Sequence, residues 1–344
     1  MKKAALLGVV AAVAVALLAV LAGGGRTASA DGGPHTVESG ATPDKCAACH
    51  RIHTGQNEFL LKQASTVQQF CYSCHGTGGP GSDLAVQEGT FYGAATPGPP
   101  YGSKPASTTL GLRAGGFEYA RIDTDDPGDE TIGVLATPQP VTSWHSSDGT
   151  IPGTVWGNGA LGTAGAGPSY SLECTSCHDP HGNGNYRVLR SVPTGSSGTG
   201  TPTPVPVAIT DQNPKVYTTS NYYSTGPVSG IQMSNWCATC HTRYLAGGPP
   251  PGPSGDAIFQ YRHRSNGTLA GLTCIKCHAP HGTNAAMPGG PTPTGTPGPG
   301  TTYSSSVPWP GGGSGTTDTN NSRLLKMNNR GICIKCHTDY GPPP

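Results

Sequence analysis

The feature that most constrains this chain is a CxxCH motif that occurs six times. All 12 cysteines fall into pairs separated by two residues, and a histidine directly follows each pair. This is the signature of c-type haem attachment, in which two thiols bond to one porphyrin and the adjacent imidazole binds the iron. Disulfides, zinc sites or redox CxxC pairs would not require a histidine at that position every time. We number the motifs in chain order: site 1 (Cys46, Cys49, His50), site 2 (Cys71, Cys74, His75), site 3 (Cys174, Cys177, His178), site 4 (Cys237, Cys240, His241), site 5 (Cys274, Cys277, His278) and site 6 (Cys333, Cys336, His337).

The histidines outside the motifs equal the predicted irons in number. One imidazole on each face of every iron would use all 12 histidines of the chain. Met233, Met287 and Met327 are competing sixth ligands, but each would leave a histidine without a role. The sequence therefore predicts six haems c, each held between two histidines, and the spare ligands are His35, His53, His145, His181, His263 and His281.

These spare histidines follow a repeat. His53, His181 and His281 each stand three residues after a motif histidine, so sites 1, 3 and 5 are doubled motifs, CxxCHxxH, and sites 2, 4 and 6 are plain motifs. The other three spare histidines lie upstream of the doubled motifs. The repeat indicates three two-haem modules. The expected organisation is a signal peptide over residues 1–30, module 1 over 31–78, a spacer over 79–144, module 2 over 145–245, a linker over 246–260 and module 3 over 261–344.

Reach limits which iron the second histidine of a doubled motif can bind. Two imidazoles on opposite faces of one iron hold their Cα atoms roughly 12 Å apart, whereas three extended residues span at most about 10 Å. His53, His181 and His281 should therefore bind a neighbouring iron, and we expect that of the next plain motif, at sites 2, 4 and 6 respectively. For His35, His145 and His263, two assignments stay open within the chain: the doubled-motif iron of their own module or that of the preceding module. The second assignment would need a neighbouring subunit to complete the ligand set.

The composition offers little material for a conventional core. The chain has 53 glycines and 34 prolines among 344 residues, and 34% of its residues are hydrophobic. A Gly and Pro share of about a quarter borders on that of disordered chains, so haems would have to supply apolar volume. We expect a mostly coil fold with few short helices and minor β-hairpins, organised around six covalently attached haems. The best helix candidate spans residues 58–70, and short strands are expected near 116–122 and 154–156.

The first residues have the features of an export signal. Lys2 and Lys3 precede an apolar run over residues 4–22, and a small-residue cleavage site follows at Ala28-Ser29-Ala30. We expect cleavage before Asp31 and no membrane span afterwards, although the run is long enough to be a retained anchor. The mature chain is then extracellular or at the cell surface, with the periplasm as the alternative. The net charge of +1 gives no indication of a nucleic-acid partner.

These features favour an electron-transfer protein that is not an enzyme. An iron with both axial positions filled cannot bind a substrate, but it can pass electrons through the porphyrin edge. A multihaem oxyanion reductase is less favoured, because it needs an open coordination position and every motif here ends in histidine. A monomeric periplasmic shuttle, or a module of a larger conduit, is the main alternative to a conducting filament.

The segments CHDPHG at 177–182, CHAPHG at 277–282 and CATCHTRY at 237–244 resemble the multihaem cytochromes of metal-reducing bacteria. Among these, the chain is similar to the hexahaem outer-surface cytochromes that polymerise into extracellular nanowires. The resemblance implies six bis-histidine haems in a continuous stack and a head-to-tail homopolymer in which an N-terminal histidine binds a haem of the adjacent subunit. Carried over, His35 is that donor and site 5 the acceptor. Other redox cytochromes, or extracellular acceptors such as metal oxides, are the implied partners.

Overall fold

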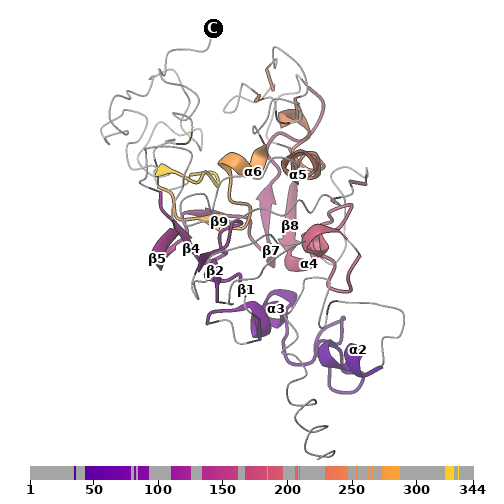
Figure 1. Cartoon of the computed structure of the whole chain (residues 1–344). Helices are drawn as coiled ribbons and strands as arrows, with labels where there is room; N and C mark the ends of the chain where they lie inside the picture. The colour runs from indigo at the N-terminus through magenta and orange to yellow at the C-terminus, as the bar shows by residue number, and fades with distance from the viewer. Residues whose placement is uncertain are drawn as a thin grey trace, which may run out of the picture.

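The structure is a computed structural model, shown in Figure 1. It describes residues 35, 43–78, 81–82, 84–92, 110–124, 134–161, 167–183, 185–196, 206–207, 209, 229–246, 253–254, 262–263, 265, 273–286, 322–328 and 332. The predicted signal peptide, most of the predicted linkers and all of site 6 lie outside these residues. In the ranges given, no helix has the length and hydropathy that a membrane crossing requires.

Five of the six motifs lie on or directly after short helices. The helices are α2 (Pro43–Cys49), α3 (Val67–His75), α4 (Cys174–Cys177), α5 (Ser229–Cys237) and α6 (Cys274–Cys277), with short 3₁₀ turns η2 (Tyr186–Val188) and η4 (Thr242–Tyr244). Residues three apart on a helix share a face, so one turn presents both thiols of a motif on the same side. In α4 and α6 the histidine that follows is extended and its N–H donates to the carbonyl of the first cysteine. The motif spacing thus builds the same local unit at different places in the chain.

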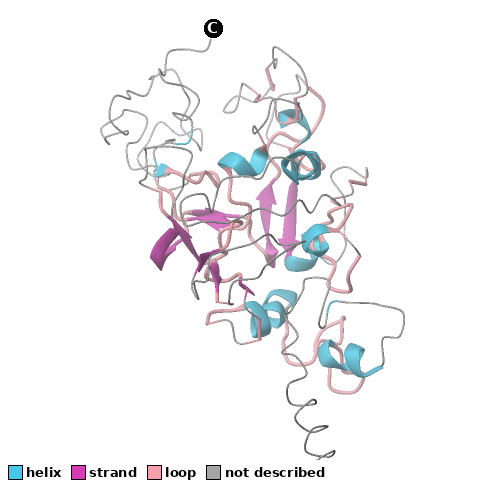
Figure 2. Ribbon diagram, viewed as in Figure 1, coloured by secondary structure: helices cyan, strands magenta, loops and turns pink. Residues whose placement is uncertain are grey.

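Short antiparallel strands connect these helical segments (Figure 2). One sheet has the order β1 (Leu84–Ala85), β2 (Thr90–Phe91) and β3 (Leu110–Gly111), and three pairs join β4 (Tyr119–Ile122) to β5 (Val134–Pro140), β6 (Ser143–Trp144) to β9 (Gly282–Thr283), and β7 (Asp148–Thr154) to β8 (Ser169–Glu173). The expected strand near residue 116–122 is β4, and the one near 154–156 is the end of β7. The β6–β9 pair matters most for the site, because it joins segments far apart in the chain in the register Ser143 to Thr283.

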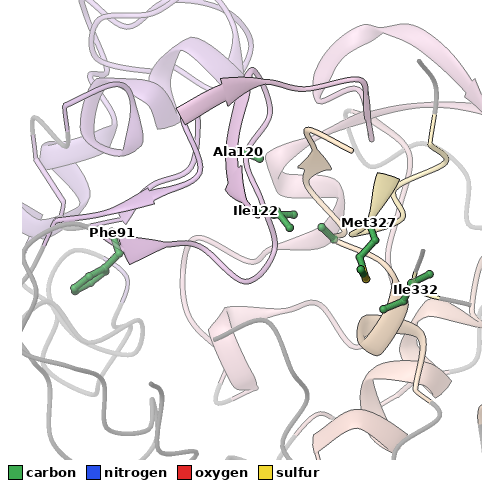
Figure 3. Close-up of a cluster of buried hydrophobic side chains, with 6 residues drawn as sticks. Phe91, Ala120, Ile122, Met327 and Ile332 are labelled. Atoms are coloured by element: carbon green, nitrogen blue, oxygen red, sulfur yellow. The ribbon is translucent and has the colours of Figure 1, made fainter. Parts of the chain in front are cut away.

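The hydrophobic core in the described part of the chain is small. Its buried members are Phe91, Ala120, Ile122, Ala279, Met327 and Ile332. In Figure 3 Ile122 points toward Met327 and Ile332, while Phe91 lies to one side. Burying a handful of such side chains contributes little compared with the conformational entropy of a chain of this length. Few helices and short strands agree with the expectation from composition; the organisation around haems remains a proposal.

The expected helix over residues 58–70 is wrong in its position. The helix that forms there is α3, which begins at Val67 behind an N-cap in which the Thr66 hydroxyl accepts from the Gln69 N–H at 3.2 Å. Residues 57–60 form a turn, and Leu60 has a φ of +53°, which no α-helix accommodates. The Phe59 carbonyl in this turn accepts a hydrogen bond from His50 at 2.7 Å, so the contact with site 1 takes precedence over helix propensity.

Gly115→Ala is expected to destabilise the protein strongly. Gly115 has a φ of +71°, and a Cβ there would overlap the carbonyl oxygen of Gly282. Positive φ alone costs a non-glycine residue about 1–3 kcal/mol, and the overlap adds to that cost. Gly153→Ala is the matched control, because its Cβ would meet only the Tyr170 carbonyl oxygen at 3.9 Å. Denaturant titration of the two holo-variants checks the prediction; equal midpoints would contradict the close approach of Gly115 to Gly282.

Candidate haem sites

Each motif histidine that the structure describes has its Nδ1 on a backbone carbonyl. A carbonyl only accepts, so Nδ1 carries the proton and the lone pair of Nε2 is free to bind a metal. The imidazoles of sites 1 to 5 are therefore held in the tautomer that an axial ligand needs. The Nδ1 to oxygen distances are 2.7 Å for His50 to Phe59, 3.0 Å for His75 to Leu84, 2.9 Å for His178 to Arg187, 2.6 Å for His241 to Trp156 and 3.1 Å for His278 to Arg323.

The doubled motifs share a supporting loop that the sequence analysis missed. In each, the acceptor carbonyl is followed by an aliphatic residue with positive φ and then by a leucine that bridges to the motif histidine. A φ above zero at leucine or valine is strained, and such strain is often found where function needs a particular backbone path. The recurring aliphatic-leucine pair was the available sequence signal. The three loops are Phe59-Leu60-Leu61, Arg187-Val188-Leu189 and Arg323-Leu324-Leu325.

Four motif histidines each face one spare histidine at nearly the same distance. The ring centroids are 6.1 Å apart for His35 and His75, 6.2 Å for His50 and His181, 6.3 Å for His145 and His241, and 6.2 Å for His178 and His281. Every pair joins one motif histidine to one spare histidine, and no histidine occurs in two of these pairs. Ordinary ring contacts would not be expected to sort themselves in this way.

The separation matches two imidazoles on opposite faces of one metal ion. With metal to nitrogen bonds of about 2 Å and roughly 1.1 Å from Nε2 to the ring centroid, the two centroids would lie about 6.2 Å apart. The four pairs therefore fit bis-histidine ligation at sites 1 to 4. The angle between the two imidazole planes differs among the pairs. It is 21° at site 1, 26° at site 2, 48° at site 4 and 64° at site 3.

Two of the spare histidines, His35 and His145, are also held through Nδ1, and their acceptors lie in the doubled motifs. His35 is bonded to the carbonyl of Pro180 at 2.8 Å, and His145 to that of Pro280 at 2.6 Å. Each of these prolines directly precedes the second histidine of its doubled motif. The doubled motif of site 3 thus supplies His181 to face site 1, and its Pro180 carbonyl holds His35 against site 2. The doubled motif of site 5 supplies His281 to site 3, and its Pro280 carbonyl holds His145 against site 4. His181 lies 3.5 Å from the carboxylate of Asp179, and the buried Nδ1 of His281 has no hydrogen-bond partner.

Burial keeps the imidazoles of the inner sites neutral. It lowers the pKa of His75, His145 and His178 below the usual value, that of His241 and His278 to about 4, and that of His281 to about 3. In each case loss of solvation is the largest cause, because a charged imidazolium is disfavoured away from water. At neutral pH these side chains have Nε2 lone pairs available without first losing a proton.

The thiols show how successive sites adjoin one another. Those of Cys71 and Cys174 are hydrogen-bonded to each other, as are those of Cys237 and Cys274, and these contacts raise the pKa of Cys71 and Cys237. Cys240 adds to the effect of burial in raising the pKa of Cys177 to about 12.

The helices show the same order. In Figure 1, α2, α3 and α4 follow one another from the bottom of the view, and α5 and α6 lie beside each other above them. Sites 1 to 5 therefore form a row in chain order.

The remaining predicted residues divide into exposed and undescribed ones. His53 and His263 are exposed, and Cys333, Cys336 and His337 lie outside the described residues. The ten cysteines that the structure describes form no disulfide with one another. Among the described side chains, no cluster of three or more His, Cys, Asp or Glu residues could hold a bare metal ion. His278 differs from the other described motif histidines, because no described imidazole faces it.

The expected pairing of the doubled-motif histidines is wrong in its direction. The reach argument assigned His181 to site 4 and His281 to site 6, but His181 faces His50 of site 1 and His281 faces His178 of site 3. His145 faces the plain site of its own module, an assignment that neither open alternative included. The physical reason is the β6–β9 pair, in which the His145 N–H donates to the His281 carbonyl at 3.1 Å. This contact places both imidazoles between modules 2 and 3.

His35 also differs from the role that the resemblance implied. It faces His75 within the same chain and is bonded to Pro180, so it is already engaged inside the subunit.

Comparison with known proteins supports the class of protein that these sites define. Residues 39–79, which contain sites 1 and 2, match the family described as the doubled CXXCH motif. This match and the motifs support a multihaem c-type cytochrome, with covalently bound haem c and a part in electron transfer. No curated protein and no solved structure matches the chain.

The residues present fit haem c. Each described motif offers two thiols on one side of a short helical segment and an imidazole with its lone pair free, and at sites 1 to 4 a second imidazole stands at the distance that an iron requires. A haem bound between two such imidazoles would pass electrons through its porphyrin edge.

Proposed function

We propose that the chain is a hexahaem cytochrome that conducts electrons along a row of haems and assembles head to tail into an extracellular filament. The observation that carries this proposal is the regular pairing of motif and spare imidazoles along sites 1 to 4. Haems held in this way exchange electrons through their porphyrin edges without binding a substrate. The protein's part is to fill both axial positions and to bring neighbouring sites together.

The pairs follow a rule that can be extended. The upstream histidine of a module faces the plain site of that module, as His35 and His145 do. The second histidine of a doubled motif faces the doubled site of the preceding module, as His181 and His281 do. By the same rule His263 belongs to site 6, which brings the number of haems with two protein ligands in one chain to five.

The rule leaves one site without a facing histidine, site 5, and one histidine without a site, His53. Site 5 is the doubled site of module 3, so by the rule its facing histidine would come from a module placed after module 3. His53 is the second histidine of the doubled motif of module 1, so by the rule it would face the doubled site of a module placed before module 1. Within one subunit the two are far apart, since α2 and α6 lie toward opposite ends of the row in Figure 1. A second copy placed after module 3 would bring its His53 to His278, and repetition of that contact produces an open head-to-tail polymer.

The surface around His53 suits such a contact. Ile52 is 81% exposed, and Phe59 and Leu60 in the same loop region are 37% and 41% exposed. Large apolar side chains gathered near an unused ligand are typical of a protein interface. We therefore propose a second copy of this chain as the partner at module 1, and export to the cell surface as the setting, with the periplasm as the alternative. Metal oxides or other cytochromes are the proposed external acceptors.

The holo-protein is expected to carry six covalent haems and to be entirely low-spin in its assembled form. Mass spectrometry of the intact purified chain gives the haem count, and visible absorption gives the spin state. The reduced filament should not bind carbon monoxide at neutral pH, because no iron has an open position. Fewer than six haems would overturn the count. Ready binding of carbon monoxide by intact filaments would favour a multihaem reductase instead.

A further inference from the structure

Site 3 differs from the other paired sites in the orientation of its two imidazoles. The rings of His178 and His281 are crossed at 64°, the largest angle of the four pairs, whereas those at sites 1 and 2 are within 26° of parallel and those at site 4 are at 48°. At His281 an aromatic side chain that does not belong to any motif lies on the ring. Phe117 stacks on His281 with the centroids 4.6 Å apart and the planes at 23°.

Phe117 is held firmly by the spacer, the region to which the sequence analysis assigned no chemistry. Its N–H donates to the Val86 carbonyl at 3.1 Å, and the neighbouring Ala114 carbonyl accepts from the His281 N–H at 2.7 Å. Residues 114–117 of the spacer therefore contact both the backbone and the ring face of His281. A flat ring packed face to face on an imidazole restricts its rotation about χ2, which sets the plane in which it meets the iron.

His281 also lacks the acceptor that the other paired imidazoles have. Six of the eight paired histidines have a carbonyl at Nδ1, and His181 lies beside Asp179. The buried Nδ1 of His281 makes no hydrogen bond of full geometry, and its one backbone neighbour, Gly115, interacts with it only enough to raise its pKa against the larger effect of burial. A hydrogen bond from Nδ1 increases the electron density that an imidazole donates and so stabilises the ferric state. Without it, the ligand is a weaker donor.

We propose that Phe117 is a positioning residue that holds His281 across His178, and thereby gives the site 3 haem a higher reduction potential than its neighbours. The proposal rests on the proposed function. Crossed imidazoles leave two iron d orbitals close in energy, which favours the ferrous state compared with parallel imidazoles. The weak donor acts in the same direction. Site 3 would then be the point in the row where electrons reside longest.

The test compares the holo-protein with Phe117→Leu and Phe117→Tyr. Leucine keeps apolar volume but has no flat face, whereas tyrosine keeps the face. Electron paramagnetic resonance of the oxidised wild type should show one strongly anisotropic low-spin signal among rhombic ones. In Phe117→Leu that signal should be replaced by a rhombic one, and the highest-potential step of a redox titration should move to lower potential. In Phe117→Tyr both properties should return to those of the wild type.

Haem count and low-spin absorption separate this inference from the proposed function. A merely structural role for Phe117 would lower the haem content or produce high-spin iron, which would overturn the positioning role. Six low-spin haems with no strongly anisotropic signal, or a signal unchanged in Phe117→Leu, would also overturn it and would leave the proposed function standing. A tyrosine variant that behaves like the leucine variant would show that the ring face is not what matters.

Discussion

His53→Ala is expected to abolish filaments and to leave the site 5 haem with an open axial position. His53 is exposed and outside the four imidazole pairs, and no described imidazole faces His278. Loss of a coordinate bond at every subunit contact should prevent growth of the polymer, because the same contact is used at each step. Electron microscopy measures filament formation. Visible absorption should show close to one of the six haems becoming high-spin and able to bind carbon monoxide.

His35→Ala is the matched control for this experiment. His35 faces His75 and is bonded to Pro180 of the same chain. Its loss should open site 2 to carbon monoxide while the contact between subunits persists. If filaments survive in His53→Ala and disappear in His35→Ala, the role that the resemblance implied for His35 would be restored and the extended pairing rule would be wrong.

His281→Ala is expected to make the haem of site 3 high-spin and to leave site 6 unchanged. Its imidazole faces His178 at 6.2 Å, and no other described histidine is placed to substitute for it. The axial bond is lost outright, so close to one haem in six should change its spin state and bind carbon monoxide. Visible absorption and carbon monoxide titration of the reduced protein measure this change.

Removal of the site 6 haem identifies which iron has changed. In a variant that combines His281→Ala with Cys333→Ala and Cys336→Ala, the high-spin fraction should persist, because site 3 still holds its haem. If the high-spin signal disappears with site 6, then His281 serves the last plain motif and the reach argument from the sequence was correct. His181→Ala offers a parallel test, with site 1 as the expected target.

The reach argument excluded the iron of the histidine's own motif for a sound reason and then chose the wrong neighbour. No second histidine in the described doubled motifs faces its own motif histidine, as the three-residue span requires. The choice of the next plain motif assumed that proximity in sequence decides between neighbours. Loop-closure entropy grows only slowly with length, so a segment a hundred residues away can return at little extra cost when strand pairing rewards it. The β6–β9 register does this for His281.

Local propensity likewise gave an incomplete account of module 1. Phe59 and Leu60 lie in the range 58–70 for which a helix was expected, but they belong to the turn whose carbonyl supports His50. The same turn supports His178 and His278 from quite different sequences. A backbone path set by a tertiary contact with a motif histidine has no periodic signature, which is why pattern analysis did not detect it.

The sequence alone determined the attachment chemistry and the inventory of ligands. Two thiols and a histidine at fixed spacing lie within about one helical turn, so their attachment chemistry can be predicted from the sequence without knowledge of the fold. Only the tertiary structure decided which imidazoles face one another, on which imidazole Phe117 stacks and which histidines lie on the surface. These depend on contacts between segments distant in the chain, such as His35 with Pro180 and His145 with Pro280, and a single sequence does not record such distances.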